Sequence, residues 1–260
     1  MVSVRDLRVS DDVSPAAWIA PRLGGDFGAV TRTVPGGYEA YARICHPVAD
    51  RDGSPVNWSE VAVATGAQAH RLMQWHALVG SSDPHNFVGS LWHGSDPRRG
   101  SLELDALVAL LALLSAQAAV VSVCCFCLWE GYGWVERPAT VVSSTLAGVD
   151  SGEAAPSAPA FSAEELSRPR VELPNRRYLL LAGPLSAATQ IGGPHRRQSP
   201  NLFWPADRVW CVATELDFDS TLVGGTAELI NAILESPALD AWPVQAEDSL
   251  AADADRINRP

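Results

Sequence analysis

Four carboxylates lie at the ends of apolar segments, where acid–base chemistry could be carried out. Glu130 follows one apolar run, and Glu215, Asp217 and Asp219 lie at the end of another. If both runs are neighbouring strands, we expect Glu130, Glu215 and Asp217 to gather at one edge of a sheet. A pair of carboxylates can cleave a bond as acid and base or nucleophile. The pattern therefore allows a carboxylate-based or metal-assisted hydrolase.

The segment Asp217-Phe-Asp219-Ser-Thr221-Leu222 resembles the first motif of the haloacid-dehalogenase-like phosphatases, over about ten residues. The resemblance implies that Asp217 is a nucleophile and Asp219 an acid/base, around Mg²⁺. That family also needs a later basic residue, commonly lysine, and further aspartates. Only 39 residues follow Thr221, and they contain two arginines and no lysine. We therefore favour the alternative, in which the aspartates shape a turn that leads from a strand into a helix.

Arginine is the cation of this chain, which has 19 arginines and no lysine. The absence of lysine excludes Schiff-base chemistry and a Walker-type phosphate site. Seven arginines against two acids give residues 168–208 a local excess of five positive charges. This segment either pairs with acidic segments of the chain or binds an anionic ligand or acidic partner, since guanidinium suits carboxylate and phosphate. The predicted contact residues, together with a Trp/Pro-rich loop, are Arg176, Arg177, Arg196, Arg197, Trp204 and Arg208.

Histidine and cysteine offer weak candidates for metal ligands. Four of the six histidines fall within 24 residues, but their spacing is not that of a metal-binding helix, and they are His70, His76, His85 and His93. Cys124, Cys125 and Cys127 lie in an apolar run, where alternation places Cys125 and Cys127 on one face of a strand and Cys124 on the other. Zinc needs about four ligands. We therefore expect buried structural cysteines, no metal site and no cofactor.

The composition indicates a folded, acidic protein. The chain has 260 residues, of which 47% are hydrophobic and 19% charged, and its formal net charge is −11. Non-specific binding to nucleic acid or to an anionic membrane is therefore not expected. Residues 1–21 have no apolar core typical of a signal peptide. The five cysteines are an odd number, which favours a reducing compartment. We expect a cytoplasmic location and a single domain over 1–260.

The elements that must position these residues follow from periodicity and turn signals. Helices are expected from Ser59, as the N-cap, to about Val79, from Leu102 to about Gln117 after Ser101 as the cap, and over 227–234. Residues 138–168 are expected to form a mobile excursion rich in Ala, Ser and Pro, in which Ser162 and Glu165 have the spacing of a capping box. Strands are expected at 30–34, 38–45, 120–129, 177–182 and 209–216, with a loop at 183–200.

The fold class follows from these elements. Helices do not separate all of the last three expected strands, so at least part of the sheet should be antiparallel. We therefore predict an α+β fold with a mixed or antiparallel sheet packed with several helices.

Longer stretches resemble a family of uncharacterised proteins of high-GC Gram-positive (actinobacterial) bacteria. The resemblance covers most of the chain except about 138–168. It implies a single cytosolic module and assigns no activity or catalytic residues. The stretches are Val34-Pro-Gly-Gly-Tyr-Glu-Ala-Tyr-Ala-Arg43 with His46-Pro47, Gln74-Trp-His76, Cys127–Gly133, Ser199–Glu215 and Thr221–Gly225.

The sequence thus supports three functions. The first is binding of an anionic ligand or acidic partner through the Arg-rich segment 168–208. The second is a hydrolase that uses Glu130, Glu215, Asp217 and Asp219. The third and weakest is an immunity-type or antitoxin-like protein, which acidic charge and modest size allow.

Overall fold

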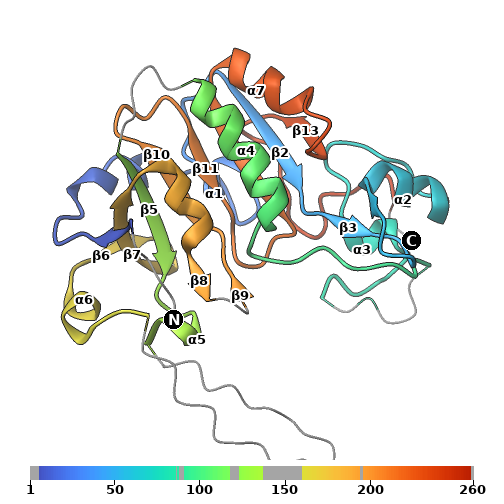
Figure 1. The fold of residues 1–260 in the computed structure, drawn as a ribbon. Helices are drawn as coiled ribbons and strands as arrows, with labels where there is room; N and C mark the ends of the chain where they lie inside the picture. The colour runs from blue at the N-terminus through green and yellow to red at the C-terminus, as the bar shows by residue number, and fades with distance from the viewer. Residues whose placement is uncertain are drawn as a thin grey trace, which may run out of the picture.

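The structure is a computed structural model, and it describes residues 6–85, 87, 91–117, 123–136, 160–193 and 196–258. Within these residues a nine-stranded sheet runs through the middle of the molecule (Figure 1). Its strands are β1 (Arg8–Val9), β2 (Ala40–Cys45), β5 (Cys124–Trp129), β6 (Arg170–Leu173), β7 (Arg176–Gly183), β10 (Leu202–Pro205), β11 (Cys211–Ala213), β12 (Ser220–Gly225) and β13 (Ala241–Val244).

The strand order is β1-β7-β5-β10-β11-β12-β2-β13, and β6 pairs with the start of β7. Each of these pairings is antiparallel. Two short ribbons lie outside the sheet, β3 (Val48–Ala49) with β4 (Pro55–Val56) and β8 (Gly192–Gly193) with β9 (Arg196–Arg197). The sheet and its helices confirm the predicted α+β class with an antiparallel sheet.

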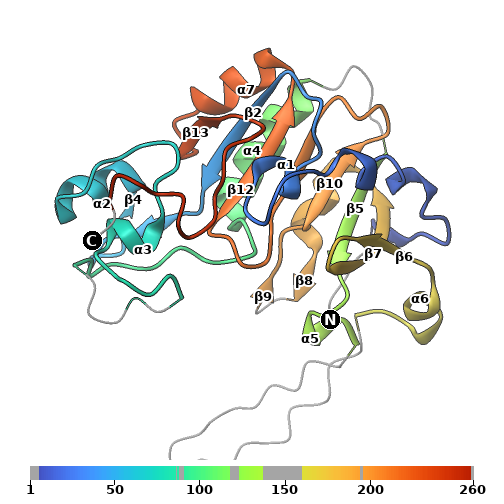
Figure 2. The same ribbon diagram turned by 180° about the vertical axis from the view of Figure 1, so that it is seen from behind.

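Helices cover the two faces of the sheet unequally. The longer helices α4 (Leu104–Ala116) and α7 (Ala227–Leu234) lie side by side on one face (Figure 1). From behind, the N-terminal segment with α1 (Val30–Thr33) crosses the other face (Figure 2). The remaining helices are α2 (Trp58–Thr65), α3 (Trp75–Leu78), α5 (Gly133–Glu136) and α6 (Ala163–Ser167). No helix in the described part of the chain is long and apolar enough to cross a membrane.

Strand β5 shows why the apolar runs are buried on both sides. Cys124, Phe126 and Leu128 pack into the core under α4 and α7, whereas Cys125 and Cys127 pack into the core under the N-terminal segment. This alternation is the one that strand geometry requires, and it confirms the predicted faces of the three cysteines. All five cysteines of the chain are buried.

Residues 30–33 form a helix, so the expected strand at 30–34 is wrong. Val30 and Val34 are both fully buried, four residues apart, which is one helical turn. The backbone N–H of Val34 donates to the carbonyl of Val30 at 3.0 Å. The β-branched side chains and the following turn favoured a strand in the sequence. A segment of five residues, however, is too short to distinguish the period of a helix from that of a strand.

The long helix expected over 59–79 is also wrong. Helix α2 begins at Trp58, after Asn57 as the N-cap, and the Glu60 carboxylate accepts the N–H of Asn57 at 2.7 Å. It ends at Gly66, which has φ +79°, a left-handed conformation that glycine adopts freely. Helix α3 then forms separately. Similarly, α4 begins after Glu103 rather than Ser101.

The last third of the chain contains strands that the sequence did not reveal. The expected Trp/Pro-rich loop is β10, a central strand with all four residues buried. The aspartates at 217 and 219 lead into β12, not into a helix. Helix α7 has the predicted bounds, and Ser162 with Glu165 forms the predicted capping box of α6. The rest of the predicted excursion, 138–159, lies outside the described residues.

Candidate functional site

Three of the four predicted carboxylates reach the same end of the sheet, and arginines bind each of them. Glu130 follows β5, and its backbone N–H donates to the carbonyl of Arg177 at 3.1 Å. The Glu130 carboxylate contacts the Nε atoms of Arg170 at 3.0 Å and Arg177 at 3.2 Å. Its two oxygens are therefore engaged by two guanidinium groups.

Glu215 and Asp217 share a third arginine. Nη2 of Arg176 lies 2.9 Å from the Glu215 carboxylate and 3.2 Å from that of Asp217. The same guanidinium lies over the ring of Trp129, 5.8 Å from its centroid. These contacts form a row of ion pairs along the sheet end, in which arginines hold the three carboxylates.

Asp219 is set apart from this row. Its side chain is only 15% exposed, against 60% for that of Asp217, so the two aspartates have different surroundings. Oδ1 of Asp219 lies 3.5 Å from Nη2 of Arg43, which is fully buried. Burial raises the pKa of Asp219, and the charge of Arg43 opposes this rise.

The Arg-rich segment is partly neutralised by this row. Arg176 and Arg177 are the cations of the pairs described above, and Arg168 lies 3.7 Å from Glu164. Pairing with acids of the same chain was the alternative to an anion-binding surface. For residues 168–177 the structure favours pairing.

The other predicted contact residues are dispersed. Arg197 donates from Nη1 to the carbonyl of Thr189 at 2.6 Å, and the backbone of Arg196 lies in β9. The guanidinium of Arg208 stacks on Trp18 at 5.4 Å. Trp204 is 1% exposed in β10, so its side chain is part of the core and cannot serve as a contact surface in this state.

The weak metal candidates do not converge. His70 binds the Asp255 carboxylate at 2.9 Å, and His93 is exposed. His76 and His85 line the same small cavity, described below. Among the residues that the structure describes, no group of three or more His, Cys, Asp or Glu could hold a metal ion.

A buried polar network surrounds Arg43, in the middle of strand β2. Nε of Arg43 donates to Oγ of Ser220 at 3.0 Å, and Nη1 donates to the carbonyl of Met73 at 2.7 Å. The guanidinium carbon lies 5.2 Å from the centroid of the Trp58 ring. Nη2 has no hydrogen-bond partner and faces Asp219. A buried arginine with a free N–H is costly, which marks this region as a candidate site.

His46 extends the network from the end of β2. Its Nδ1 contacts the carbonyl of Arg98, and its Nε2 lies 2.9 Å from Oγ1 of Thr221. Because a carbonyl only accepts, Nδ1 carries the proton and Nε2 accepts from the threonine hydroxyl. Burial lowers the pKa of His46 to about 4. The imidazole is therefore neutral at physiological pH.

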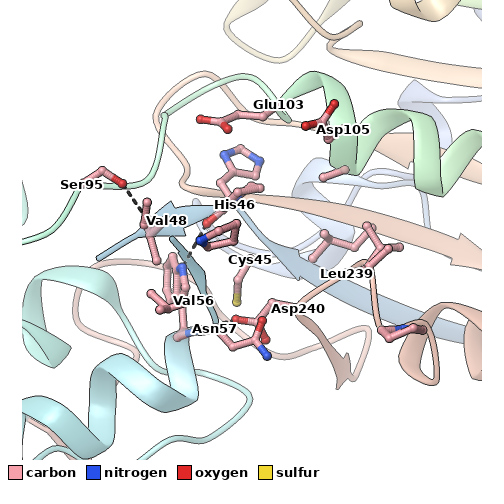
Figure 3. A pocket seen from close by; sticks show the side chains of 18 residues that line it. Cys45, His46, Val48, Val56, Asn57, Ser95, Glu103, Asp105, Leu239 and Asp240 are labelled. Atoms are coloured by element: carbon pink, nitrogen blue, oxygen red, sulfur yellow. Dashed lines mark hydrogen bonds between the residues drawn. The ribbon is translucent and has the colours of Figure 1, made fainter. Parts of the chain in front are cut away.

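A pocket of about 430 Å³ opens beside this network (Figure 3). This volume is within the range of small-molecule sites. Its polar side chains include Glu103 and Asp105 from the start of α4, and Asp240 from the segment before β13. The other lining residues are Ile44, Cys45, His46, Pro47, Val48, Ala49, Pro55, Val56, Asn57, Trp58, Ser95, Ala106, Pro237, Ala238 and Leu239.

The charges of this acidic pocket have one sign. Asp240 accepts the backbone N–H of Trp58 at 2.7 Å and the Trp242 indole N–H at 3.0 Å. Burial raises the pKa of Asp240, and these hydrogen bonds oppose the rise. Glu103 and Asp105 are exposed, and no residue in the described ranges forms an ion pair with either. The described residues that line the pocket include no arginine.

A smaller cavity of about 140 Å³ lies by the Asp217–Asp219 turn. Asp219, His76 and Arg99 provide its charged and titratable groups, with Asp217 and His85. Its remaining lining residues are Phe27, Gln74, Pro84, Phe218, Ser220, Leu250 and Ala252. Of the four predicted catalytic carboxylates, this cavity therefore contains Asp217 and Asp219.

The sequence analysis missed the most deeply buried of these groups. Arg43 lies within the apolar strand Ala40–Cys45, and a charged residue in a buried strand was the available signal. His46-Pro47 belongs to the stretches that carry the family resemblance, which assigns it no role. Glu103 and Asp105 lie at the start of a helix, where acids are common, so their types alone do not indicate a pocket.

Comparisons with protein-family models, with curated proteins and with solved structures find no match to this chain.

Proposed function

We propose that this chain is a binding protein whose acidic pocket takes an organic cation, such as an amine or a guanidinium group. The observation that carries the proposal is the one-sided charge of the 430 Å³ pocket. Its ionised side chains are carboxylates, and its histidine is neutral because burial lowers the pKa of His46 to about 4. A cation entering this pocket meets attraction and no lining cation.

Glu103 and Asp105 supply the strongest attraction, because neither carboxylate is neutralised by an ion pair within the described residues. Both also lie at the N-terminus of α4, where negative charge stabilises a helix by about 0.3–1 kcal/mol. Helix stabilisation alone would explain these two acids without any ligand. The experiment must therefore separate ligand binding from helix stabilisation.

The deeper walls of the pocket favour an organic rather than a hydrated inorganic cation. Ile44, Val48, Val56 and Leu239 are apolar, and Trp58 contributes an aromatic ring. Such walls suit the alkyl part of an amine or guanidine ligand.

The test uses agmatine, which carries an amine and a guanidinium group, with butyrate as an anion of comparable chain length. Calorimetric titration at low salt should detect agmatine and not butyrate. The double variant Glu103→Gln/Asp105→Asn should weaken agmatine binding at least tenfold, or about 1.4 kcal/mol.

Glu228→Gln is the matched control, because Glu228 occupies in α7 the same position of the first turn that Asp105 occupies in α4. It removes a helix-stabilising charge without touching the pocket. Equal binding of agmatine by the double variant and by Glu228→Gln would contradict the proposal, as would equal binding of agmatine and butyrate.

Among the described side chains of the Arg-rich segment, Arg197 and Arg208 form no ion pair, and we propose a contact through these two. The pairing of Arg176 and Arg177 with acids weakens it elsewhere. A cytoplasmic location belongs to the proposal as well, supported by five buried cysteines without disulfides.

A further inference from the structure

The 140 Å³ cavity beside the Asp217–Asp219 turn combines a half-buried imidazole, a largely buried carboxylate and a guanidinium. His76 comes from α3, Asp219 from the turn before β12, and Arg99 from the loop before α4. Separate segments thus bring an acid, a base and a cation to one small cavity. Such a gathering of titratable and charged groups in one cavity is typical of reactive sites.

His76 is suited to accept a proton. Burial lowers the pKa of its imidazole, whereas the negative charges of Asp219, Asp255 and Asp83 raise it and Arg99 lowers it. The ring is therefore neutral at physiological pH, and Asp219 is the carboxylate with the largest effect on it. A carboxylate in this position stabilises the imidazolium that forms when the ring takes a proton.

The buried side chain of Arg43 contacts the Asp219 carboxylate. It faces Oδ1 of Asp219 at 3.5 Å, and Arg43 is itself fixed by hydrogen bonds to Ser220 and Met73. No described side chain donates a hydrogen bond to the Asp219 carboxylate. Its exposed part, 15% of the side chain, contributes to the cavity wall.

Arg99 is fixed at the other side of the cavity. Its Nη1 donates to Nδ1 of His85 at 3.3 Å, and its Nη2 contacts the carbonyl of Pro84. The guanidinium carbon also lies 5.2 Å from the ring centroid of Phe87. A positioned cation can stabilise negative charge that develops on an oxygen of a substrate.

We propose that this cavity is a hydrolytic site for small neutral esters, with His76 as general base, Asp219 as the carboxylate whose charge stabilises the imidazolium, and Arg99 as the cation that faces the carbonyl oxygen. His76 takes a proton from water, and the water oxygen forms a bond to the carbonyl carbon. The electron pair of the C=O bond moves to the oxygen beside Arg99. The electron pair on that oxygen then re-forms the C=O bond while the bond to the alkoxy group breaks. His76 returns the proton to the leaving alkoxy group, so ester and water give acid and alcohol.

The cavity selects a neutral substrate with a small acyl group. The described lining contains two aspartates, Asp217 and Asp219, and one arginine, Arg99. Its net negative charge repels an anion such as a phosphate ester. Phe27 and Phe218 contact each other edge to face, with ring centroids 5.8 Å apart, and form an apolar wall. The small volume excludes a bulky acyl chain.

The test measures hydrolysis of p-nitrophenyl acetate, an activated ester of a small acyl group, by the full-length protein. His76→Ala should lower kcat/KM at least tenfold. His93→Ala is the matched control, because His93 is exposed and lies outside the cavity. Equal rates for these two variants would overturn the proposal, because they would show that surface imidazoles account for the reaction.

The role of Asp219 has its own readout, the pH dependence of the rate. Without the Asp219 charge the imidazolium is less stable, so Asp219→Asn should move the inflection of kcat/KM to lower pH. Glu228→Gln, which alters an exposed acid outside the cavity, should leave the inflection in place. An unchanged inflection in Asp219→Asn would contradict this electrostatic role.

Discussion

His46 is a polar residue without access to solvent, and its hydrogen bonds fix its protonation state. The carbonyl of Arg98 requires a proton on Nδ1, and in the neutral ring Nε2 accepts from the hydroxyl of Thr221. The hydroxyl of Thr221 lies 2.8 Å from that of Thr214, which can donate to it in turn. A second proton on the ring would place a charge in a buried site near Arg43, so burial favours the neutral ring in the folded protein.

This residue predicts a loss of stability in acid. The folded pKa of His46, about 4, lies below the value near 6.5 of an unfolded histidine. The unfolded state therefore binds more protons between these values, and stability falls as the pH drops from 6.5 to 4. From pH 7 to 4 the contribution is about 3 kcal/mol.

The variant His46→Asn removes this titration, and its side-chain amide retains a donor. Urea unfolding at pH 7 and pH 4 should show a loss in the wild type that exceeds the loss in the variant by about 3 kcal/mol. Asp219 and Asp240 are present in both proteins, so their opposite effects cancel in the comparison. The same pH dependence in both proteins would show that His46 is not the titrating group.

At the scale of elements, the loop before α4 is held against the turn between β11 and β12. The N–H of Gly100 donates to the carbonyl of Phe218 at 2.8 Å, and its carbonyl accepts from the Gln198 amide at 2.8 Å. Gly100 has φ +70°, and a Cβ on it would lie 2.6 Å from the carbonyl oxygen of Leu216. This close approach carries Arg99 to the small cavity.

Gly100→Ala should therefore destabilise the protein and disturb this cavity. The left-handed conformation alone costs about 1–2 kcal/mol for alanine, and the clash with Leu216 adds about 1–3 kcal/mol. Gly53→Ala is the matched control, because Gly53 has φ +83° but open space around it. Urea unfolding should give Gly100→Ala a loss at least 1 kcal/mol greater than Gly53→Ala. Equal losses would mean that the loop can move away from Leu216.

Local signals predicted some elements well and failed where long-range pairing decides. Helix α7 has a clear apolar stripe and a capping Thr226, so its bounds followed from the sequence. Strand β12 ends in Gly224 and Gly225, which weaken a strand signal, and it forms because it pairs with β11 and β2. Strand β10 ends in Pro205, a residue typical of loops, yet it lies between β5 and β11.

The candidate sites divide in the same way. The Asp217–Asp219 spacing drew attention to a turn that lines the small cavity, because these acids are close in sequence. Arg43, His76 and Asp219 meet only through the sheet order and the packing of α3, which no local pattern encodes. Likewise, the charge balance of 168–208 did not show which acids lie opposite its arginines.

At the scale of the molecule, the C-terminal segment 245–258 ties the N-terminal third together. The N–H of Val30 donates to the carbonyl of Asp248 at 2.9 Å, and the N–H of Leu250 donates to the carbonyl of Gly28 at 2.7 Å. Arg71 contacts the Asp248 carboxylate at 3.0 Å. The segment also supplies Leu250 and Ala252 to the small cavity. The hydrolytic site thus depends on contacts between the two ends of the chain.

Asp255 anchors this segment, with a side chain that is 1% exposed. It binds His70 at 2.9 Å and accepts backbone N–H groups of Gln74 at 3.1 Å and Asn258 at 2.9 Å. Burial alone would raise the pKa of this carboxyl, but the hydrogen bonds hold it below its usual value. The carboxylate form is thus built into the fold, and its stabilising effect is lost as the pH falls below about 4.

Asp255→Asn should release the C-terminal segment before the rest of the molecule unfolds. The new amide has one acceptor oxygen where the carboxylate had two, so one group of N–H donors is left unsatisfied, at a cost of about 1–3 kcal/mol. Hydrogen exchange at pH 7 should then be faster across 245–258 and α3, while β5 and β7 keep their protection. Glu247→Gln, an exposed acid of the same segment, should exchange as the wild type does. Uniform loss of protection in Asp255→Asn would instead show that the segment and the sheet unfold as one unit. In the expected case, release of the segment also removes Leu250 from the cavity wall, so hydrolysis of p-nitrophenyl acetate should fall while agmatine binding at the acidic pocket persists.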